Sequence, residues 1–173
     1  RRDPVGRFAN ENHTQSSEVS LAPQKAGQYN EEDFQQELGS LERTPWGAPQ
    51  DMHHAGTGIA VIGTAGHGGI KLSAERNRKI PKPLRRPGGW YEEDCEAGIP
   101  MWVFPDADYG LSGEYSEPQS VRDRANESVR NWYPDEWEEV TGKPIQPGES
   151  HQRDEAVWNE THKNDFVANW AST

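Results

Sequence analysis

The order of apolar and polar positions divides the chain into two parts. Residues 1–43 are rich in Gln, Asn, Ser and Glu with scattered apolar positions, whereas all seven tryptophans follow residue 43. The first part buries too little apolar surface to offset the entropy of ordering it. We therefore predict an arm over 1–43, flexible or ordered by a partner, and a compact tryptophan-rich domain over 44–173.

One stretch of the arm has helical periodicity. Asn30 is a suitable N-cap, three acids follow it in the first turn, and Phe34, Leu38 and Leu41 share one face. So narrow an apolar face is not stable by itself and must dock on the domain or on a partner. Phe34, Leu38 and Leu41 are therefore candidate partner-binding residues.

The domain begins with a pattern typical of a β-hairpin over 57–73. A β-branched run at 58–63 is bounded by glycines, a turn follows at 64–66, and apolar and polar positions alternate over 67–72. A last alternating segment predicts a C-terminal strand over 165–171.

The clearest helix is expected over 117–132. Val121, Ala125, Val129 and Trp132 have the spacing of one helical face, while charged residues cover the other. These four side chains are expected to form a buried stripe.

Capping residues and helix breakers predict shorter helices over 74–79, 91–104, 135–140 and 150–160. Ser73 and Ser150 cap the first and the last of them, and Ala156, Val157 and Trp158 are expected to face inward. The predicted fold is α+β: a small antiparallel sheet, made by the hairpin and the C-terminal strand, covered by several helices.

Composition narrows the possible classes of protein. The net charge is −11, and Leu, Ile, Val and Phe make up only about 14% of the chain, although seven Trp and five Tyr add large apolar areas. A single cysteine excludes an internal disulfide, and the acidic balance argues against nucleic-acid binding. No run approaches the roughly 18 apolar residues of a membrane span, and no secretion leader is visible at the start.

Several motifs of the domain resemble a small family of unknown function found in bacteria, plasmids and phages. In chain order they are Thr44-Pro45-Trp46-Gly47, Thr64-Ala65-Gly66-His67-Gly68-Gly69-Ile70-Lys71-Leu72-Ser73-Ala74-Glu75-Arg76, Gly89-Trp90-Tyr91-Glu92-Glu93-Asp94-Cys95-Glu96, Asn131-Trp132-Tyr133-Pro134 and Gln146-Pro147-Gly148-Glu149-Ser150. The resemblance covers about residues 44–173. It implies no established activity, and it suggests a phage-encoded protein in the host cytoplasm or in a virion.

His67 beside Gly68 and Gly69 is the strongest chemical candidate. Glycines let a ligand approach the backbone, and a histidine there can act as a base or a metal ligand. The acids of 92–96, among them Glu92, Glu93 and Asp94, would complete a site for a hard or borderline cation. The alternative is structural: the glycines serve the hairpin, His67 bonds to the backbone, and the acids begin a helix. On that helix Glu92 and Glu96 share a face, whereas Glu93 points elsewhere.

Charge is distributed unevenly along the domain. Segment 71–89 carries seven Lys and Arg against one acid, whereas 90–118 carries eight acids and no Lys or Arg. The two segments either cover each other or form a docking surface, for which Arg76, Arg85 and Arg86 are candidate partner-binding residues. His53 and His54 are expected to be solvated in a loop.

These observations support three functional hypotheses. The first is a non-catalytic protein-interaction or assembly module with a host or virion protein as partner, without metal, cofactor or membrane; it leaves the oligomeric state open. The second is a small metal-assisted hydrolase or lyase that uses His67 and the 92–96 carboxylates. The third is an anti-defence protein whose acids at 92–96 and 135–139 imitate nucleic-acid phosphates. Convergence of His67 Nε2 with two of the carboxylates in an open cleft would favour the enzyme, whereas separation of these groups, or a His67 bonded only to backbone, would count against it.

Overall fold

The computed structural model describes residues 30–165. Residues 1–29 of the expected arm, and the expected C-terminal strand beyond Asp165, lie outside the described residues. The division of the chain into an arm and a domain at residue 43 therefore stays a prediction.

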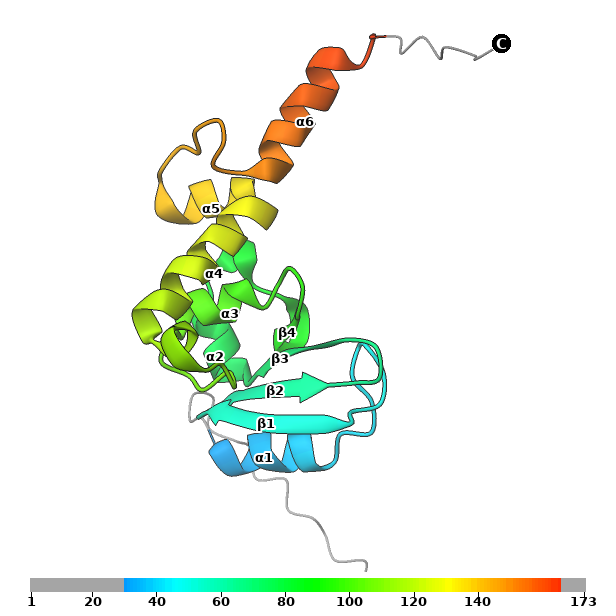
Figure 1. Ribbon diagram of the computed structural model, residues 1–173. Coiled ribbons are helices and arrows are strands. Elements are labelled where there is room, and N and C mark those ends of the chain that lie inside the picture. The colour runs from blue at the N-terminus through cyan, green and yellow to red at the C-terminus, as the bar shows by residue number, and fades with distance from the viewer. Residues whose placement is uncertain (1–29, 166–173) are drawn as a thin grey trace, which may run out of the picture.

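The predicted α+β class is confirmed (Figure 1). Four antiparallel strands form one sheet in the order β1-β2-β3-β4, and the expected hairpin supplies its two inner strands. The strands are β1 (Asp51–Gly56), β2 (Ile59–Gly63), β3 (Gly68–Leu72) and β4 (Trp90–Glu92). Sequence patterns missed both edge strands, because β1 has mostly exposed polar side chains and β4 is only three residues long.

Six α-helices accompany the sheet within residues 30–165. They are α1 (Glu31–Gly39), α2 (Ala74–Lys79), α3 (Gly98–Val103), α4 (Pro118–Trp132), α5 (Pro134–Thr141) and α6 (His151–His162). Short 3₁₀ turns, η1 (Lys82–Leu84), η2 (Pro87–Gly89) and η3 (Gly113–Ser116), fill the connections. The predicted caps are confirmed: the Ser73 hydroxyl accepts from Arg76 N, and that of Ser150 accepts from Arg153 N.

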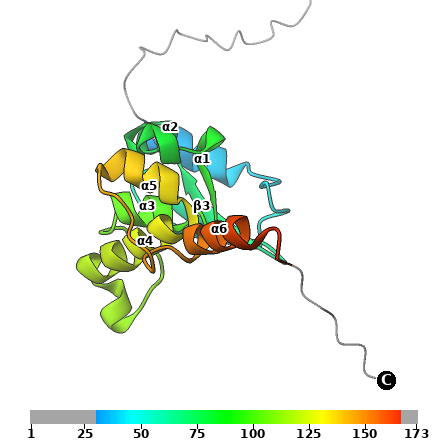
Figure 2. The ribbon, with the colours of Figure 1, turned by 90° about the horizontal axis from the view of Figure 1, so that it is seen from above.

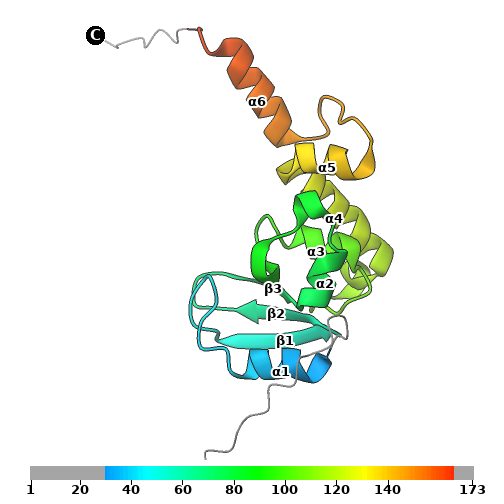
Figure 3. The same cartoon turned by 180° about the vertical axis from the view of Figure 1, so that it is seen from behind.

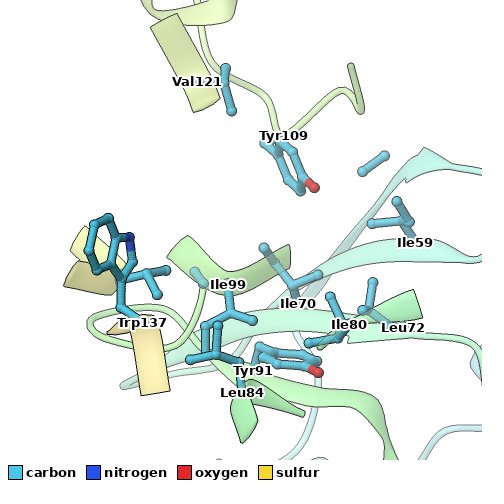
Figure 4. Close-up of a cluster of buried hydrophobic side chains, with 13 residues drawn as sticks. Ile59, Ile70, Leu72, Ile80, Leu84, Tyr91, Ile99, Tyr109, Val121 and Trp137 are labelled. Atoms are coloured by element: carbon cyan, nitrogen blue, oxygen red, sulfur yellow. The ribbon is translucent and has the colours of Figure 1, made fainter. Parts of the chain in front are cut away.

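The sheet has apolar side chains on both faces, as the alternation along β2 requires. Ile59 belongs to the main core with Ile70, Leu72 and Tyr91, which packs against α2–α5 (Figures 2 and 4). Ala60 and Ile62 belong to a second cluster on the face that α1 covers. The sheet is therefore the middle layer of three.

Helix α1 confirms the predicted helix after Asn30, whose side chain accepts from Glu32 N. Phe34 and Leu38 are 3% and 4% exposed and pack with Ala60 and Ile62 of β2. These two candidate partner-binding side chains thus contact the sheet of their own chain, and Leu41 packs against the same cluster half-buried.

A buried lysine joins the α1 layer to the sheet. Lys71 of β3 is 7% exposed, and its Nζ donates to Gly88 O at 2.7 Å. The same Nζ pairs with Glu37 Oε1 of α1 at 3.0 Å and lies 4.8 Å from the ring centroid of Trp90. One cation therefore links α1, β3, η2 and β4.

Two predictions of inward-facing side chains were wrong. Val121, Ala125 and Val129 are buried on α4 as expected, but Trp132 is 41% exposed. It is the last residue of the helix, beyond the part that faces α3 and the sheet. On α6, Ala156, Val157 and Trp158 are exposed, because this helix projects from the body rather than packing on it (Figure 3).

The helix expected over 91–104 is also wrong in its first half. Trp90–Glu92 pairs with β3 as a strand, turns follow, and the helix begins only at Gly98. The pairing of Trp90–Glu92 with β3 outweighs the stabilisation that the following acids would gain in the first turn of a helix. Among residues 30–165, no helix is both long and apolar enough to cross a bilayer.

We predict that Trp137→Ala lowers the free energy of unfolding by about 3–5 kcal/mol, because Trp137 is 6% exposed and its indole N–H donates to Asn126 Oδ1 at 2.8 Å. Trp132→Ala is the matched control and should cost less than about 1.5 kcal/mol. Urea denaturation measures both. Equal losses would mean that the end of α4 is packed in solution.

Candidate metal centre

His67 stands at the end of the turn that joins β2 to β3. The Thr64 hydroxyl donates to His67 O at 2.6 Å and accepts from His67 N at 3.3 Å, while Thr64 N donates to the same carbonyl at 2.8 Å. The backbone of His67 is therefore fixed, and its imidazole, 59% exposed, is not among these bonds. Thr64 was not among the residues predicted to form the site, although a threonine hydroxyl in a tight turn commonly hydrogen-bonds the nearby backbone.

Glu92 and Glu93 reach His67 because β4 pairs with β3. The register sets Gly69 opposite Glu92, and Glu93 N donates to Gly68 O at 3.1 Å. Both glutamates consequently lie at the end of the sheet where His67 immediately precedes β3.

The three side chains converge at that end. His67 Nδ1 lies 3.7 Å from Glu92 Oε1 and 3.9 Å from Glu93 Oε1. One ligand atom from each of the three residues lies within 4.8 Å of the others, and this is the one such group of His, Cys, Asp or Glu found within residues 30–165. The expectation that Glu93 points elsewhere was wrong, because it assumed a helix where the chain forms a strand and turns.

Glu92 is held in place by one oxygen and leaves the other unused. Its Oε2 accepts from Asp94 N at 2.8 Å and from Cys95 N at 3.2 Å. Its Oε1 is buried and has no hydrogen-bond donor within residues 30–165, since Nδ1 of His67 is too far away at 3.7 Å. A buried carboxylate oxygen without a partner is costly, so this atom is suited to receive a cation.

The two glycines after His67 have different roles. A Cβ on Gly69 would lie 2.3 Å from the Trp46 ring and 2.2 Å from Tyr91 O, so Gly69 permits close packing. A Cβ on Gly68 would lie 2.6 Å from Glu93 Oε2 and 2.9 Å from Ile62 O. Gly68 therefore leaves the space that the Glu93 carboxylate occupies beside His67.

The donor set of one imidazole and two carboxylates suits borderline divalent ions such as Zn²⁺ or Mn²⁺. With bonds of about 2.1 Å, tetrahedral ligand atoms lie about 3.4 Å apart. The two distances from His67 Nδ1, 3.7 and 3.9 Å, exceed that value slightly, and all three ligand atoms lie within 4.8 Å of one another, so closing the site around an ion requires side-chain rotations.

The other acids of 92–96 lie outside this group. Asp94 is exposed, and Glu96 pairs with Arg86 Nε at 2.5 Å. Burial raises the pKa of the Cys95 thiol, and the carboxylates of Glu92, Asp94 and Glu96 raise it further. A raised pKa disfavours the thiolate, so Cys95 is a poor nucleophile.

The three arginines proposed for partner binding make contacts within the chain. Arg76 Nε donates to Thr57 O at 2.8 Å, and Arg85 donates to the carbonyls of Arg78 and Ile80. Arg86 holds Glu96 and lies 4.7 Å from the ring of Tyr133. The Arg86–Glu96 pair joins the basic segment 71–89 to the acidic segment 90–118. Such a contact is expected if the two segments cover each other.

His53 and His54 lie on strand β1 and not in the expected loop. Both are exposed. His53 Nε2 bonds to Asp108 O at 2.9 Å, and His54 Nδ1 lies 3.1 Å from Gln35 Nε2 of α1. They contact different parts of the chain because adjacent strand residues point to opposite faces.

Comparison with known proteins assigns most of the chain to a family. A family model described as Domain of unknown function (DUF7007) matches residues 39–163. The chain belongs to the DUF7007 family. The matched range includes the turn at 64–67, the three converging side chains and α6, and it confirms the expected membership of a family of unknown function. No curated protein and no solved structure matches the chain.

We predict that Gly68→Ala destabilises this DUF7007 domain by about 1–3 kcal/mol, because the new methyl group meets Ile62 O and displaces the Glu93 carboxylate. Gly66→Ala is the matched control in the same turn, since a Cβ there has nothing within 4 Å. Urea denaturation compares the two. An unchanged midpoint for Gly68→Ala would show that the β3–β4 end is not closely packed.

Proposed function

We propose that the DUF7007 domain binds a divalent metal ion at His67, Glu92 and Glu93 and acts as a small metal-assisted hydrolase or lyase. The observation that carries the proposal is the convergence of the three side chains near the buried Oε1 of Glu92, which has no hydrogen-bond donor within residues 30–165. A cation there would give this oxygen the partner that it lacks.

The arrangement is suited to chemistry as well as to binding. Three protein ligands leave coordination positions for water or substrate, and a bound ion would lower the pKa of that water and polarise a substrate oxygen. Glu92 is anchored by two backbone N–H groups, which limits the reorganisation that binding requires. The exposed imidazole and the half-exposed Glu93 leave the site accessible from solvent.

A competing interpretation needs no metal. Protonated His67 could balance the two carboxylates as a surface ion pair, which would contribute little to stability. The two interpretations differ in their response to added metal and in the effect of removing the imidazole.

We expect calorimetric titration of the metal-free protein with Zn²⁺ or Mn²⁺ to show one site per chain. His67→Gln, Glu92→Gln and Glu93→Gln should each weaken binding by more than about tenfold, because each removes a direct ligand. The matched control is Asp94→Asn, which removes a neighbouring exposed carboxylate outside the group and should leave the affinity unchanged. His67→Gln should also leave the melting temperature of the metal-free protein nearly unchanged.

The proposal fails if the wild-type chain binds neither ion, or if Asp94→Asn weakens binding as much as Glu92→Gln. The second result would indicate diffuse attraction to the acidic segment rather than a defined site.

The enzymatic part is tested with p-nitrophenyl acetate and bis(p-nitrophenyl) phosphate as probe substrates. Metal-loaded protein should hydrolyse at least one of them, EDTA should abolish turnover, and Asp94→Asn should retain it while His67→Gln does not. If the protein binds metal but hydrolyses neither probe, the site either only binds metal or acts on other substrates.

The protein-interaction hypothesis, with a phage-encoded chain acting on a host or virion protein, stays a prediction. The nucleic-acid mimic is less well supported, because Glu96, Asp135 and Glu138 pair with arginines of the same chain and leave fewer free charges.

A further inference from the structure

A second surface lies on α6, the helix that projects from the body at the end away from α1 (Figures 1 and 3). Val157 and Trp158 of α6 are each 60% exposed. Between α6 and the segment 145–147 lies a mainly apolar groove of about 360 Å³, lined by Ile145, Pro147, Val157 and Trp158 among others. Adjacent large apolar side chains on such a groove are typical of a binding surface.

The two walls of the groove are held by one carboxylate. Glu138 Oε1 accepts from Ile145 N at 2.6 Å on one wall and pairs with Arg153 of α6 at 2.7 Å on the other. These two contacts, the Ile145 N–H first, lower the pKa of Glu138. Glu138 therefore ties the two walls of the groove together.

The first turn of α6 is fixed to the body of the domain. The Ser150 hydroxyl donates to Asn131 O at 3.1 Å, and His151 N donates to Asn131 Oδ1 at 2.8 Å. Arg153 also pairs with Asp135 of α5. A partner thus meets a helix whose orientation is already set, which reduces the ordering cost of binding.

Trp158 forms a ridge between two hollows. His162 stacks on its ring with the centroids 4.5 Å apart, which holds the indole in place. On the other side of Trp158 lies a hollow of about 450 Å³ whose lining includes Asp154 and Glu155.

The rim of this surface is acidic. Arg153 is balanced by Asp135 and Glu138, so Asp154 and Glu155 give the surface beside Trp158 a negative charge. The whole chain carries −11. An apolar floor with an acidic rim is complementary to a segment that has apolar anchors and basic flanks.

We propose that α6 and residues 145–147 form a docking site for a basic amphipathic helix of a protein partner, with Trp158 and Val157 as the main apolar contacts. A groove along a helix accepts anchors spaced at i, i+3, i+4 and i+7. A second copy of the chain is a poorer occupant, since it would bring another acidic rim and another −11 to the interface. The site does not depend on metal at His67.

The test uses the full chain and a fluorescein-labelled peptide of about 15 residues with Leu at the anchor positions and Lys elsewhere. One control peptide replaces every Lys by Glu, and another has the same Leu and Lys in scrambled order. Fluorescence anisotropy should show binding of the amphipathic Lys peptide at least about tenfold tighter than of either control, and weakening as salt is added.

Variants of the protein locate the bound peptide. Trp158→Ala and Val157→Ala should each weaken binding, the first by about tenfold or more, because exposed tryptophans commonly dominate such contacts. Trp132→Ala removes another exposed tryptophan, at the end of α4, and should have no effect. Glu155→Lys should weaken binding severalfold, whereas the matched control Glu127→Lys, exposed on α4, should do so much less.

Three outcomes would overturn the proposal. The first is equal binding by Trp158→Ala and the wild type. The second is a Trp158-dependent dimer in light scattering, which would make a second copy the occupant. The third is a gain in affinity of about tenfold when Phe166→Ser and Trp170→Ser are combined, which would make residues 166–173 the occupant. Unchanged affinity of that double variant supports an external partner.

Discussion

Pairing of the buried Lys71 ammonium holds helix α1 against the sheet. A buried cation is stable only where its charge is balanced and its donors are used, and Lys71 meets Glu37 of α1, Gly88 O of η2 and the Trp90 ring at the same time. Lys71 is also the register partner of Trp90. A shift of β4 by one residue would move the Trp90 ring away from the ammonium, while Glu37 of α1 would still balance its charge.

The candidate metal centre follows from that register. Once Lys71 is opposite Trp90, Gly69 is opposite Glu92 and Glu93 N reaches Gly68 O. His67, fixed by the Thr64 turn, then meets both glutamates although they are about 25 positions away in the sequence. The site is thus positioned by backbone pairing at the end of a sheet, and it requires no long helix to present its ligands.

Local patterns predicted the parts of the fold that local physics decides. The hairpin, the buried face of α4 as far as Val129, and the caps at Asn30, Ser73 and Ser150 depend on residues close in sequence, and these were predicted. Strand β4 was missed because it has only three residues and is followed by acids, a pattern that resembles the start of a helix. Its pairing with β3 decides the outcome, and that contact is not local in sequence. For the same reason the sequence singled out His67, Glu92, Glu93 and Asp94 as candidates but could not separate Glu92 and Glu93 from Asp94. The exposure of Trp158 could not be predicted from the sequence either, because apolar periodicity does not show whether a helix packs against the rest of the domain.

The lengths of the connections between the strands affect the order in which the strands pair during folding. Strands β1, β2 and β3 are joined by tight turns, so their pairing needs only short loops to close. Strand β4 joins the sheet only after the longer excursion through α2, η1 and η2, which makes its contacts with β3 the less local ones. The three-residue cluster spans this last junction, so a chain that has folded only its hairpins already displays His67 but has no glutamates beside it.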